Sequence, residues 1–233
     1  MKKLFVAGCS FSDFTKVNKV YGQFLAEKLG YDYVHEGAGC GSNWRIWRTI
    51  TKHIMTGNLT ASDLLIVQYT CRERQEFYSA LDQPKELDKP NSIDYLKTIE
   101  KFNNGNIIRF KAESHVWQHN KEEREFFRLY EKYFVDIEFA REQFITQNYS
   151  FQKMLLSNKI NAIFINSFRC PPLSRASVLP EYLPTFKEPV DDHTELLKYN
   201  LEPNDYGHMN QLGHEIFAEW LFAHINNTVK EKL

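Results

Sequence analysis

The stretch Asp63-Leu64-Leu65-Ile66-Val67-Gln68-Tyr69-Thr70 holds four consecutive apolar residues at its centre. A strand with one face in water alternates apolar and polar residues, whereas an unbroken apolar run suits a strand that is covered on both faces. Sheets that are covered on both faces are typical of α/β proteins with parallel strands. Residues 63–70 therefore predict a buried strand of a parallel sheet.

Similar apolar runs occur on both sides of this strand, and helical patterns separate them. Strands are expected at residues 2–7, 31–35, 63–70 and 160–168, and helices at residues 20–29, 43–55 and 212–225. Gly30 is expected to end the first helix, and Asn43 to cap the second. Alternating strands and helices predict an α/β fold with a parallel sheet.

A long interruption separates the third and fourth predicted strands. We interpret residues 80–158 as an α-rich insertion within a single domain that spans residues 1–233. Residues 107–112 favour a short extra strand. Residues 121–156 have a helical pattern that fits either one helix or two, with Asn148-Tyr149-Ser150 as the candidate break.

Composition excludes several classes of partner. The chain has 233 residues and a formal net charge of −1, so no global charge attracts it to nucleic acid or to an anionic membrane. No apolar run approaches the roughly 20 residues that span a bilayer, and the apolar start is too short for a signal peptide. We expect a cytoplasmic protein with no membrane or nucleic-acid partner; association with a virus particle is the alternative.

No cofactor or metal is expected. The four cysteines, Cys9, Cys40, Cys71 and Cys170, form no CxxC pair and are interpreted as small apolar residues, with a thiolate metal site as the alternative. Residues 37–41 are rich in glycine, but they follow the second predicted strand. A dinucleotide-binding turn follows the first strand and has the spacing GxGxxG.

Three chemically useful residues lie far apart in the chain. Ser10 follows the first predicted strand, and Asp205 precedes His208 by three residues just before the last helix. A serine hydroxyl is a weak nucleophile unless a base takes its proton, and an imidazole oriented by a carboxylate is such a base. Ser10, His208 and Asp205 are therefore the candidate nucleophile, base and orienting group. Ser12 is the alternative serine.

Together these segments resemble the SGNH (GDSL-type) hydrolase superfamily. Gly8-Cys9-Ser10 is similar to its Gly-Asp-Ser block, Gly39-Cys40-Gly41-Ser42-Asn43 to its glycine block, and Asp205-Tyr206-Gly207-His208 to its Asp-x-x-His block. The resemblance implies a three-layer, flavodoxin-like α/β fold. It also implies that Ser10 is the nucleophile and that the backbone amide of Gly41 donates to the oxyanion, with Asn43 on the helix behind it.

The chain departs from the family at its third block. The family has Gly-x-Asn-Asp after the third strand, where this chain has Gln68-Tyr69-Thr70-Cys71-Arg72-Glu73-Arg74. The asparagine that donates to the oxyanion is missing. Thr70, Arg72 and Arg74 are the candidates to replace it, because a hydroxyl or a guanidinium can also donate to a developing negative charge.

The resemblance implies an esterase or deacetylase that acts through an acyl-serine, with an O-acyl group on a carbohydrate as the expected substrate. Five aromatic residues are candidates for stacking on sugar rings, with core packing as the alternative: Trp44, Trp47, Tyr78, Trp117 and Phe168. Two other functions stay open. One is a catalytically weak or inactive module that binds a glycan or a partner, and the other is a structural or assembly protein of a phage particle. A homo-oligomer is also left open.

Overall fold

The computed structural model describes most of the α/β core. The described residues are 1–9, 12, 17–38, 41–70, 74–78, 107–111, 121–134, 136–166, 178–182 and 209–228. For residues 74–78 and 107–111 the description is limited to the backbone.

Four parallel strands form the central sheet. They are β1 (Lys3–Gly8), β2 (Asp32–Gly37), β3 (Leu64–Tyr69) and β6 (Asn161–Asn166), and they lie in the order β2-β1-β3-β6. Numbered along the chain, this order is 2-1-3-4, which is the flavodoxin-like order. The predicted α/β fold with a parallel sheet is confirmed.

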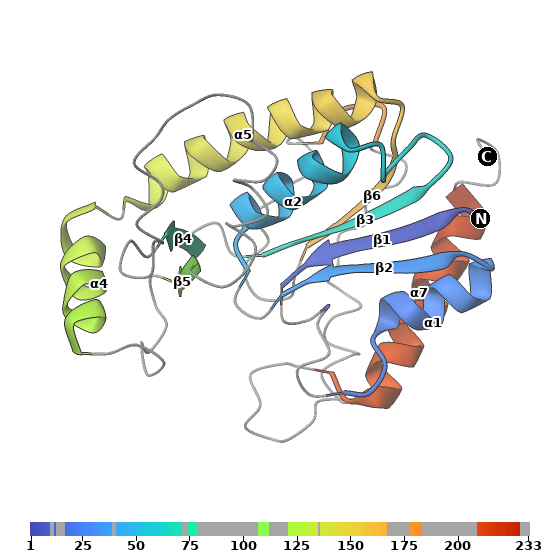
Figure 1. Ribbon diagram of the computed structural model, residues 1–233, viewed down its shortest axis with the longest axis horizontal. Coiled ribbons are helices and arrows are strands. Elements are labelled where there is room, and N and C mark those ends of the chain that lie inside the picture. Colours follow the sequence, from blue (N-terminus) through green and yellow to red (C-terminus); the bar gives the residue numbers. More distant parts are fainter. Residues whose placement is uncertain are drawn as a thin grey trace, which may run out of the picture.

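Helices cover both faces of the sheet, so the fold has three layers. Helices α2 (Asn43–Met55) and α5 (Ile137–Ser157) lie on one face, and α1 (Tyr21–Leu29) and α7 (Gln211–Thr228) lie on the other (Figure 1). Successive side chains of a strand point to opposite faces. Both sets must therefore be apolar, which explains the unbroken apolar runs in the sequence.

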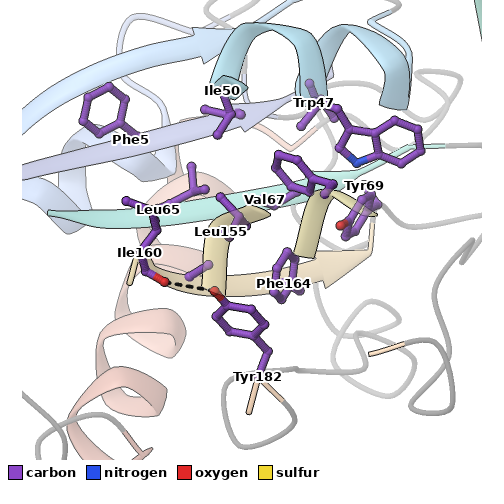
Figure 2. Close-up of a cluster of buried hydrophobic side chains, with 14 of the residues drawn as sticks. Phe5, Trp47, Ile50, Leu65, Val67, Tyr69, Leu155, Ile160, Phe164 and Tyr182 are labelled. Atoms are coloured by element: carbon purple, nitrogen blue, oxygen red, sulfur yellow. Dashed lines mark hydrogen bonds between the residues drawn. The ribbon is translucent and has the colours of Figure 1, made fainter. Parts of the chain in front are cut away.

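The layer beneath α2 and α5 is the larger of the two cores. Figure 2 shows side chains from β1, α2, β3, α5 and β6 converging there. Its strand residues include Phe5, Leu65, Val67 and Phe164, and its helix residues include Ile46, Ile50, Phe151 and Leu155. The hydroxyl of Tyr182 closes one end of this layer by donating to the backbone oxygen of Ile160 at 3.1 Å.

The opposite core is smaller and has a polar end. Leu4 and Val6 of β1, Leu64 and Ile66 of β3, and Ile163 and Ile165 of β6 pack against α1 and α7. The next residues on this face, toward the carboxyl ends of the strands, are Gly8 on β1 and Gln68 on β3. Apolar packing on this face therefore ends one position before each strand does.

Helix ends follow the sequence in one case and differ in another. Gly30 ends α1 in the left-handed conformation, with φ of 69°, as predicted. The predicted cap of α2 was wrong by one residue, because Ser42 is the N-cap and its hydroxyl accepts from the backbone N–H of Arg45 at 3.1 Å. Asn43 is the first helical residue, so its side chain points elsewhere.

Residues between β3 and β6 form two short strands and two helices. Strands β4 (Arg74–Tyr78) and β5 (Ile107–Lys111) pair antiparallel in a separate sheet, which confirms the extra strand predicted at 107–112. Helices α4 (Lys121–Phe134) and α5 follow. Because α5 packs on the central sheet, part of the segment interpreted as an insertion contributes to the main core.

The predicted helix break at residues 148–150 was wrong. The chain breaks before α5, where the carboxylate of Asp136 caps that helix by accepting from the N–H of Phe139 at 2.9 Å. Asn148 lies inside α5, is buried, and accepts a hydrogen bond from the hydroxyl of Tyr69. Its polar side chain therefore serves a contact with the sheet and does not end the helix.

Two absences concern the part of the chain that the structure describes. No helix there is long and apolar enough to cross a membrane. No cis peptide bond occurs there either.

Truncating Leu155 tests whether α5 belongs to the main core. Leu155→Ala removes a fully buried side chain, and such changes typically lower the free energy of unfolding by about 2–5 kcal/mol. Tyr149→Ala, on the exposed face of the same helix, should change it by less than about 0.5 kcal/mol. Urea denaturation of both variants measures the difference, and equal effects would mean that α5 does not pack on the sheet.

Candidate active site at the carboxyl edge of the sheet

Because the four strands are parallel, their carboxyl ends share one edge, where functional loops of such sheets lie. Among the predicted site residues, Gly41, Asn43 and Thr70 are fully described at this edge. Arg74 is described by its backbone, which begins β4 and pairs with Lys111. Ser10, Arg72, Asp205 and His208 lie outside the described residues, and so do Gly39 and Cys40.

The segments that follow β1 and β2 lie against each other. The backbone N–H of Ala38 donates to the oxygen of Gly8 at 3.2 Å, and a Cβ on Gly41 would lie 3.3 Å from the same oxygen. Gly41 is therefore beside the end of the strand that leads to Ser10. Its N–H donates to the oxygen of Ala38 at 3.0 Å, so an oxyanion would have to share this donor.

Asn43 joins the start of α2 to the end of β3. Its Nδ2 donates to the backbone oxygen of Thr70 at 2.9 Å, and its Oδ1 accepts from the N–H of Thr70, also at 2.9 Å. Both residues are buried. The pair replaces the ladder hydrogen bonds that a longer strand would make, and it fixes the backbone of Thr70. The hydroxyl of Thr70 is buried and has no hydrogen-bond partner among the described residues.

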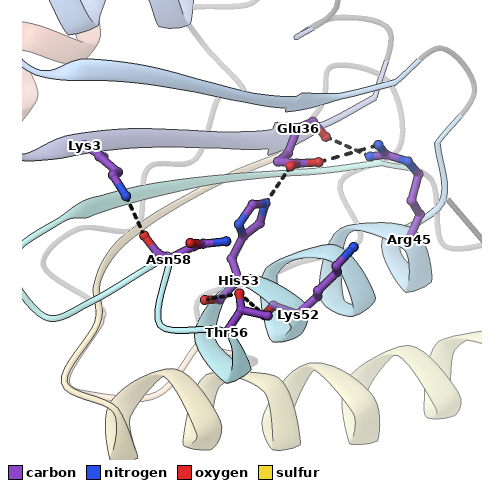
Figure 3. A network of polar contacts seen from close by, with 7 residues as sticks. All are labelled: Lys3, Glu36, Arg45, Lys52, His53, Thr56 and Asn58. Carbon is purple, nitrogen blue, oxygen red and sulfur yellow. Dashed lines mark hydrogen bonds and ion pairs between the residues drawn. The ribbon is translucent and has the colours of Figure 1, made fainter. Parts of the chain in front are cut away.

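Glu36 holds the end of β2 to the same helix (Figure 3). Arg45 Nη1 donates to the backbone oxygen of Glu36 at 2.7 Å, and His53 Nε2 lies 2.6 Å from a carboxylate oxygen of Glu36. These contacts span the first and last turns of α2. They set the orientation of α2, and hence the position of the loop that carries Gly41.

The segment after β1 ends in a buried hydrogen-bond network. Ser12 donates its backbone N–H to the oxygen of Cys9 at 2.9 Å, so the two residues enclose positions 10 and 11 in the sequence. The Ser12 hydroxyl donates to Oε1 of Gln68 and lies 3.1 Å from the hydroxyl of Tyr21. Because the Ser12 hydroxyl is buried and already bonded, it is a poor alternative nucleophile. Burial raises the pKa of Tyr21 well above its ordinary value, so its hydroxyl stays protonated.

The segment after His208 reaches the start of α1. Met209 is buried in the smaller core, and Asn210 caps α7 by accepting from the N–H of Gly213 at 2.9 Å. The side-chain amide of Gln211 accepts from the backbone N–H of Lys19 at 3.2 Å and donates to its oxygen at 2.7 Å. The residue that directly follows His208 therefore packs near the start of α1.

His214 makes a second connection between α7 and α1. Its Nδ1 accepts from the backbone N–H of Tyr21 at 3.2 Å, and the two rings stack with centroids 6.1 Å apart. An Nδ1 that accepts a hydrogen bond belongs to a neutral imidazole with its proton on Nε2. His214 is buried, in agreement with the packing role that its position in the helix indicated.

Sequence reasoning missed three residues of this network: Tyr21, Gln68 and the bonded state of Ser12. One signal was present, because Gln68 is the first polar residue after the apolar run of β3. Of the aromatic residues proposed for sugar stacking, Trp44 is about half exposed at the start of α2, whereas Trp47 is buried against Phe144. The side chain of Tyr78 and the residues Trp117 and Phe168 lie outside the description.

Metal ligands do not gather in the described ranges, where no group of three or more His, Cys, Asp or Glu side chains could hold an ion. Cys9 is buried and carries a free thiol. Cys40, Cys71 and Cys170 fall outside those ranges, so the thiolate alternative for the four cysteines concerns residues of which three are not described.

No family model matches the sequence, and no curated protein matches it. Two solved structures are similar to the fold. One is described as a lipolytic protein of the G-D-S-L family from Desulfitobacterium hafniense DCB-2; it is 9% identical, with a TM-score of 0.46, over 96% of this chain and 99% of the other. The second is an acetyl xylan esterase from the rumen bacterium Butyrivibrio proteoclasticus, 11% identical, with a TM-score of 0.49, over 98% of this chain.

This chain covers 64% of the acetyl xylan esterase, which is less than two thirds of its length. Identities of 9% and 11% assign neither a family nor an activity. The chemistry of the site is therefore inferred from the residues of this chain.

Removing the Asn43 side chain tests the link between α2 and β3. Asn43→Ala leaves two buried backbone groups of Thr70 without partners, and each such group costs roughly 1–3 kcal/mol. We expect the free energy of unfolding to fall by about 2–4 kcal/mol. Asn227→Ala, at an exposed position of α7, should cost less than about 0.5 kcal/mol in the same denaturant titration. Equal effects would contradict the link.

Proposed function

We propose that the protein is a serine hydrolase that cleaves a carboxylic ester through an acyl-enzyme. The observation that carries this proposal is the meeting of two segments at the start of α1. Ser12 contacts Tyr21, and the chain that leaves His208 contacts Lys19 and Tyr21. Segments that flank the candidate nucleophile and the candidate base therefore end at one place, although about 200 residues separate them in the sequence.

In the proposed reaction, the hydroxyl oxygen of Ser10 attacks the ester carbonyl. His208 takes the hydroxyl proton and then gives it to the departing alkoxide, which leaves an acyl group on Ser10. Asp205 orients the imidazole and stabilises its protonated form. Water, activated by His208, then attacks the acyl-serine and releases the acid. Atoms and charge balance without a metal or a cofactor.

Thr70 is the best supported replacement for the missing oxyanion asparagine. Its hydroxyl is an unused buried donor among the described residues, and Asn43 fixes its backbone on both sides of the α-carbon. A donor that is held in place before reaction loses no energy to reorganisation when the oxyanion forms. Arg72 and Arg74 stay as alternatives. The backbone amides of Ser10 and Gly41 would complete the oxyanion site.

We assign the substrate to esters that carry an acyl group on a carbohydrate. The supporting feature is Trp44, whose side chain is about half exposed one residue after Asn43. An indole face next to the reacting groups can stack on a sugar ring. This assignment is finer than the reaction class, and it fails separately if simple esters are cleaved and sugar esters are not.

A non-catalytic binding module is the second candidate, and one observation favours it. The backbone N–H groups of Gly41 and Thr70 both donate within the protein, so neither is reserved for an oxyanion. Such a module would bind an oligosaccharide, with quenching of Trp44 fluorescence, and would not react with an acylating or phosphonylating reagent.

Covalent labelling of Ser10 tests the reaction class. The native protein should release a burst of p-nitrophenol from p-nitrophenyl acetate and should be labelled by a fluorophosphonate, because both reagents need an activated serine. Ser10→Ala should abolish the burst and the label. Ser150→Ala, at an exposed position of α5, is the matched control and should retain both. Absence of burst and label in the native protein would favour the binding module.

Replacing the Thr70 hydroxyl by a methyl group tests the oxyanion donor. Thr70→Val should lower kcat by about 10²–10³ with little change in KM, because a donor used in the transition state is lost. Stability should not fall, since the change removes an unpaired buried hydroxyl. Thr49→Val, at a buried position of α2, should retain activity. Normal turnover of Thr70→Val with low turnover of Arg72→Ala or Arg74→Ala would assign the role to an arginine.

A further inference from the structure

Gln68 occupies a position where the fold calls for an apolar residue. Leu64 and Ile66, the preceding residues on the same face of β3, pack in the core under α1 and α7. Gln68 is equally buried, and its Nε2 has no hydrogen-bond partner among the described residues. A leucine would fill similar space without an unpaired donor, so packing alone does not explain a glutamine here.

The partners of Gln68 come from two different elements. Its Oε1 accepts from the Ser12 hydroxyl, on the segment that follows β1, and lies 3.4 Å from the Tyr21 hydroxyl at the start of α1. Tyr21 also lies 3.1 Å from the Ser12 hydroxyl, which closes a triangle of polar atoms. These contacts bind the segment after β1 to both the sheet and α1.

Gly8 keeps the space for this network. A Cβ at position 8 would lie 2.4 Å from the Ser12 hydroxyl oxygen and 3.2 Å from Oε1 of Gln68. Contacts below about 3 Å do not occur between real side chains, so any larger residue would displace the serine. The glycine before the candidate nucleophile is therefore required by a contact made two residues after it.

His214 extends the network to the last helix. Its Nδ1 accepts from the N–H of Tyr21, and the Tyr21 ring packs edge-on against Phe217 at 4.9 Å between centroids. Tyr21 thus contacts the segment that follows Ser10 through its hydroxyl and the helix that follows His208 through its backbone and ring. One residue connects the two catalytic segments.

We propose that Gln68, Ser12, Tyr21 and His214 form a positioning network, which holds the segment after Ser10 and the segment after His208 in a fixed relation. The proposal rests on the proposed function for its catalytic consequence, since a hydroxyl and its base must stay within hydrogen-bond reach. Gln68 is a positioning residue, because it acts through Ser12 and Tyr21. Its cost in buried polarity is offset by the precision of that relation.

Gln68→Leu separates positioning from packing. We expect kcat toward p-nitrophenyl acetate to fall on the order of 10- to 100-fold, because small displacements of reacting groups have effects of this size. KM should change less than about twofold, and the melting temperature should stay the same or rise. A residue with a purely structural role would lower the melting temperature and leave the kcat of the folded protein unchanged.

Gln152→Leu is the matched control. Gln152 is also a fully buried glutamine, but it lies on α5 at the opposite face of the sheet, where its Oε1 accepts from the N–H of Leu179 at 2.8 Å. This variant should lower the melting temperature and leave kcat unchanged. If Gln68→Leu does not fold, Tyr21→Phe removes the hydroxyl while retaining the ring, and it should lower kcat in the same way.

Hydrogen exchange tests the coupling without relying on activity. In Gln68→Leu, amide exchange should accelerate both in peptides that contain Ser12 and in peptides that contain His214, although His214 does not contact residue 68 directly in our account. His214→Asn, which retains an acceptor for the Tyr21 N–H, should exchange like the native protein, whereas His214→Leu should not.

Acceleration confined to the Ser12 peptides, or unchanged kcat in both Gln68→Leu and Tyr21→Phe, would overturn the positioning network. A native protein that is neither labelled by fluorophosphonate nor active would instead overturn the proposed function. In that case the exchange measurement still decides the coupling: joint acceleration supports it, and acceleration at one segment refutes it.

Discussion

Burial of the parallel sheet on both faces is the constraint on which the rest of the structure depends. Helices cover each face, so a strand side chain in the middle of the sheet must be apolar whichever way it points. Polar chemistry is thereby confined to the carboxyl edge, where strands give way to loops. The buried polar residues near that edge, Ser12, Asn43, Gln68 and Thr70, each mark a place where one loop is attached to another element.

The hydrogen bonds at this edge matter more through their absence than through their presence. A satisfied hydrogen bond contributes about 1 kcal/mol, whereas a buried group left unpaired costs roughly 1–3 kcal/mol. Asn43 satisfies both backbone groups of Thr70, so this contact is chiefly a way to end a strand without a penalty. The Thr70 hydroxyl and Gln68 Nε2 are different, because they are buried donors without partners in the described part of the chain. Native proteins retain such groups mainly where function uses them.

Much of the fold could be predicted because apolar periodicity reports burial directly: residues 63–67 indicate a strand covered on both sides, and Gly30 indicates a helix end. The errors arose where one polar residue serves a distant partner. Asn43 resembles a cap, but its amide reaches Thr70, and Asn148 resembles a helix break, but it bonds to Tyr69. Local sequence does not encode such long-range contacts. For the site, the motifs predicted the edge, whereas the network around Gln68 depends on pairings that only the fold brings together.

The central claim is that a serine after β1 and a histidine before α7 act as one unit at this edge. A crystal structure of the protein after reaction with a fluorophosphonate tests it most directly. Our account predicts phosphorus bonded to Ser10 Oγ, an imidazole nitrogen of His208 within hydrogen-bond reach of that oxygen, and a phosphoryl oxygen facing the Thr70 hydroxyl. An adduct on another residue, or His208 far from the adduct, would contradict it.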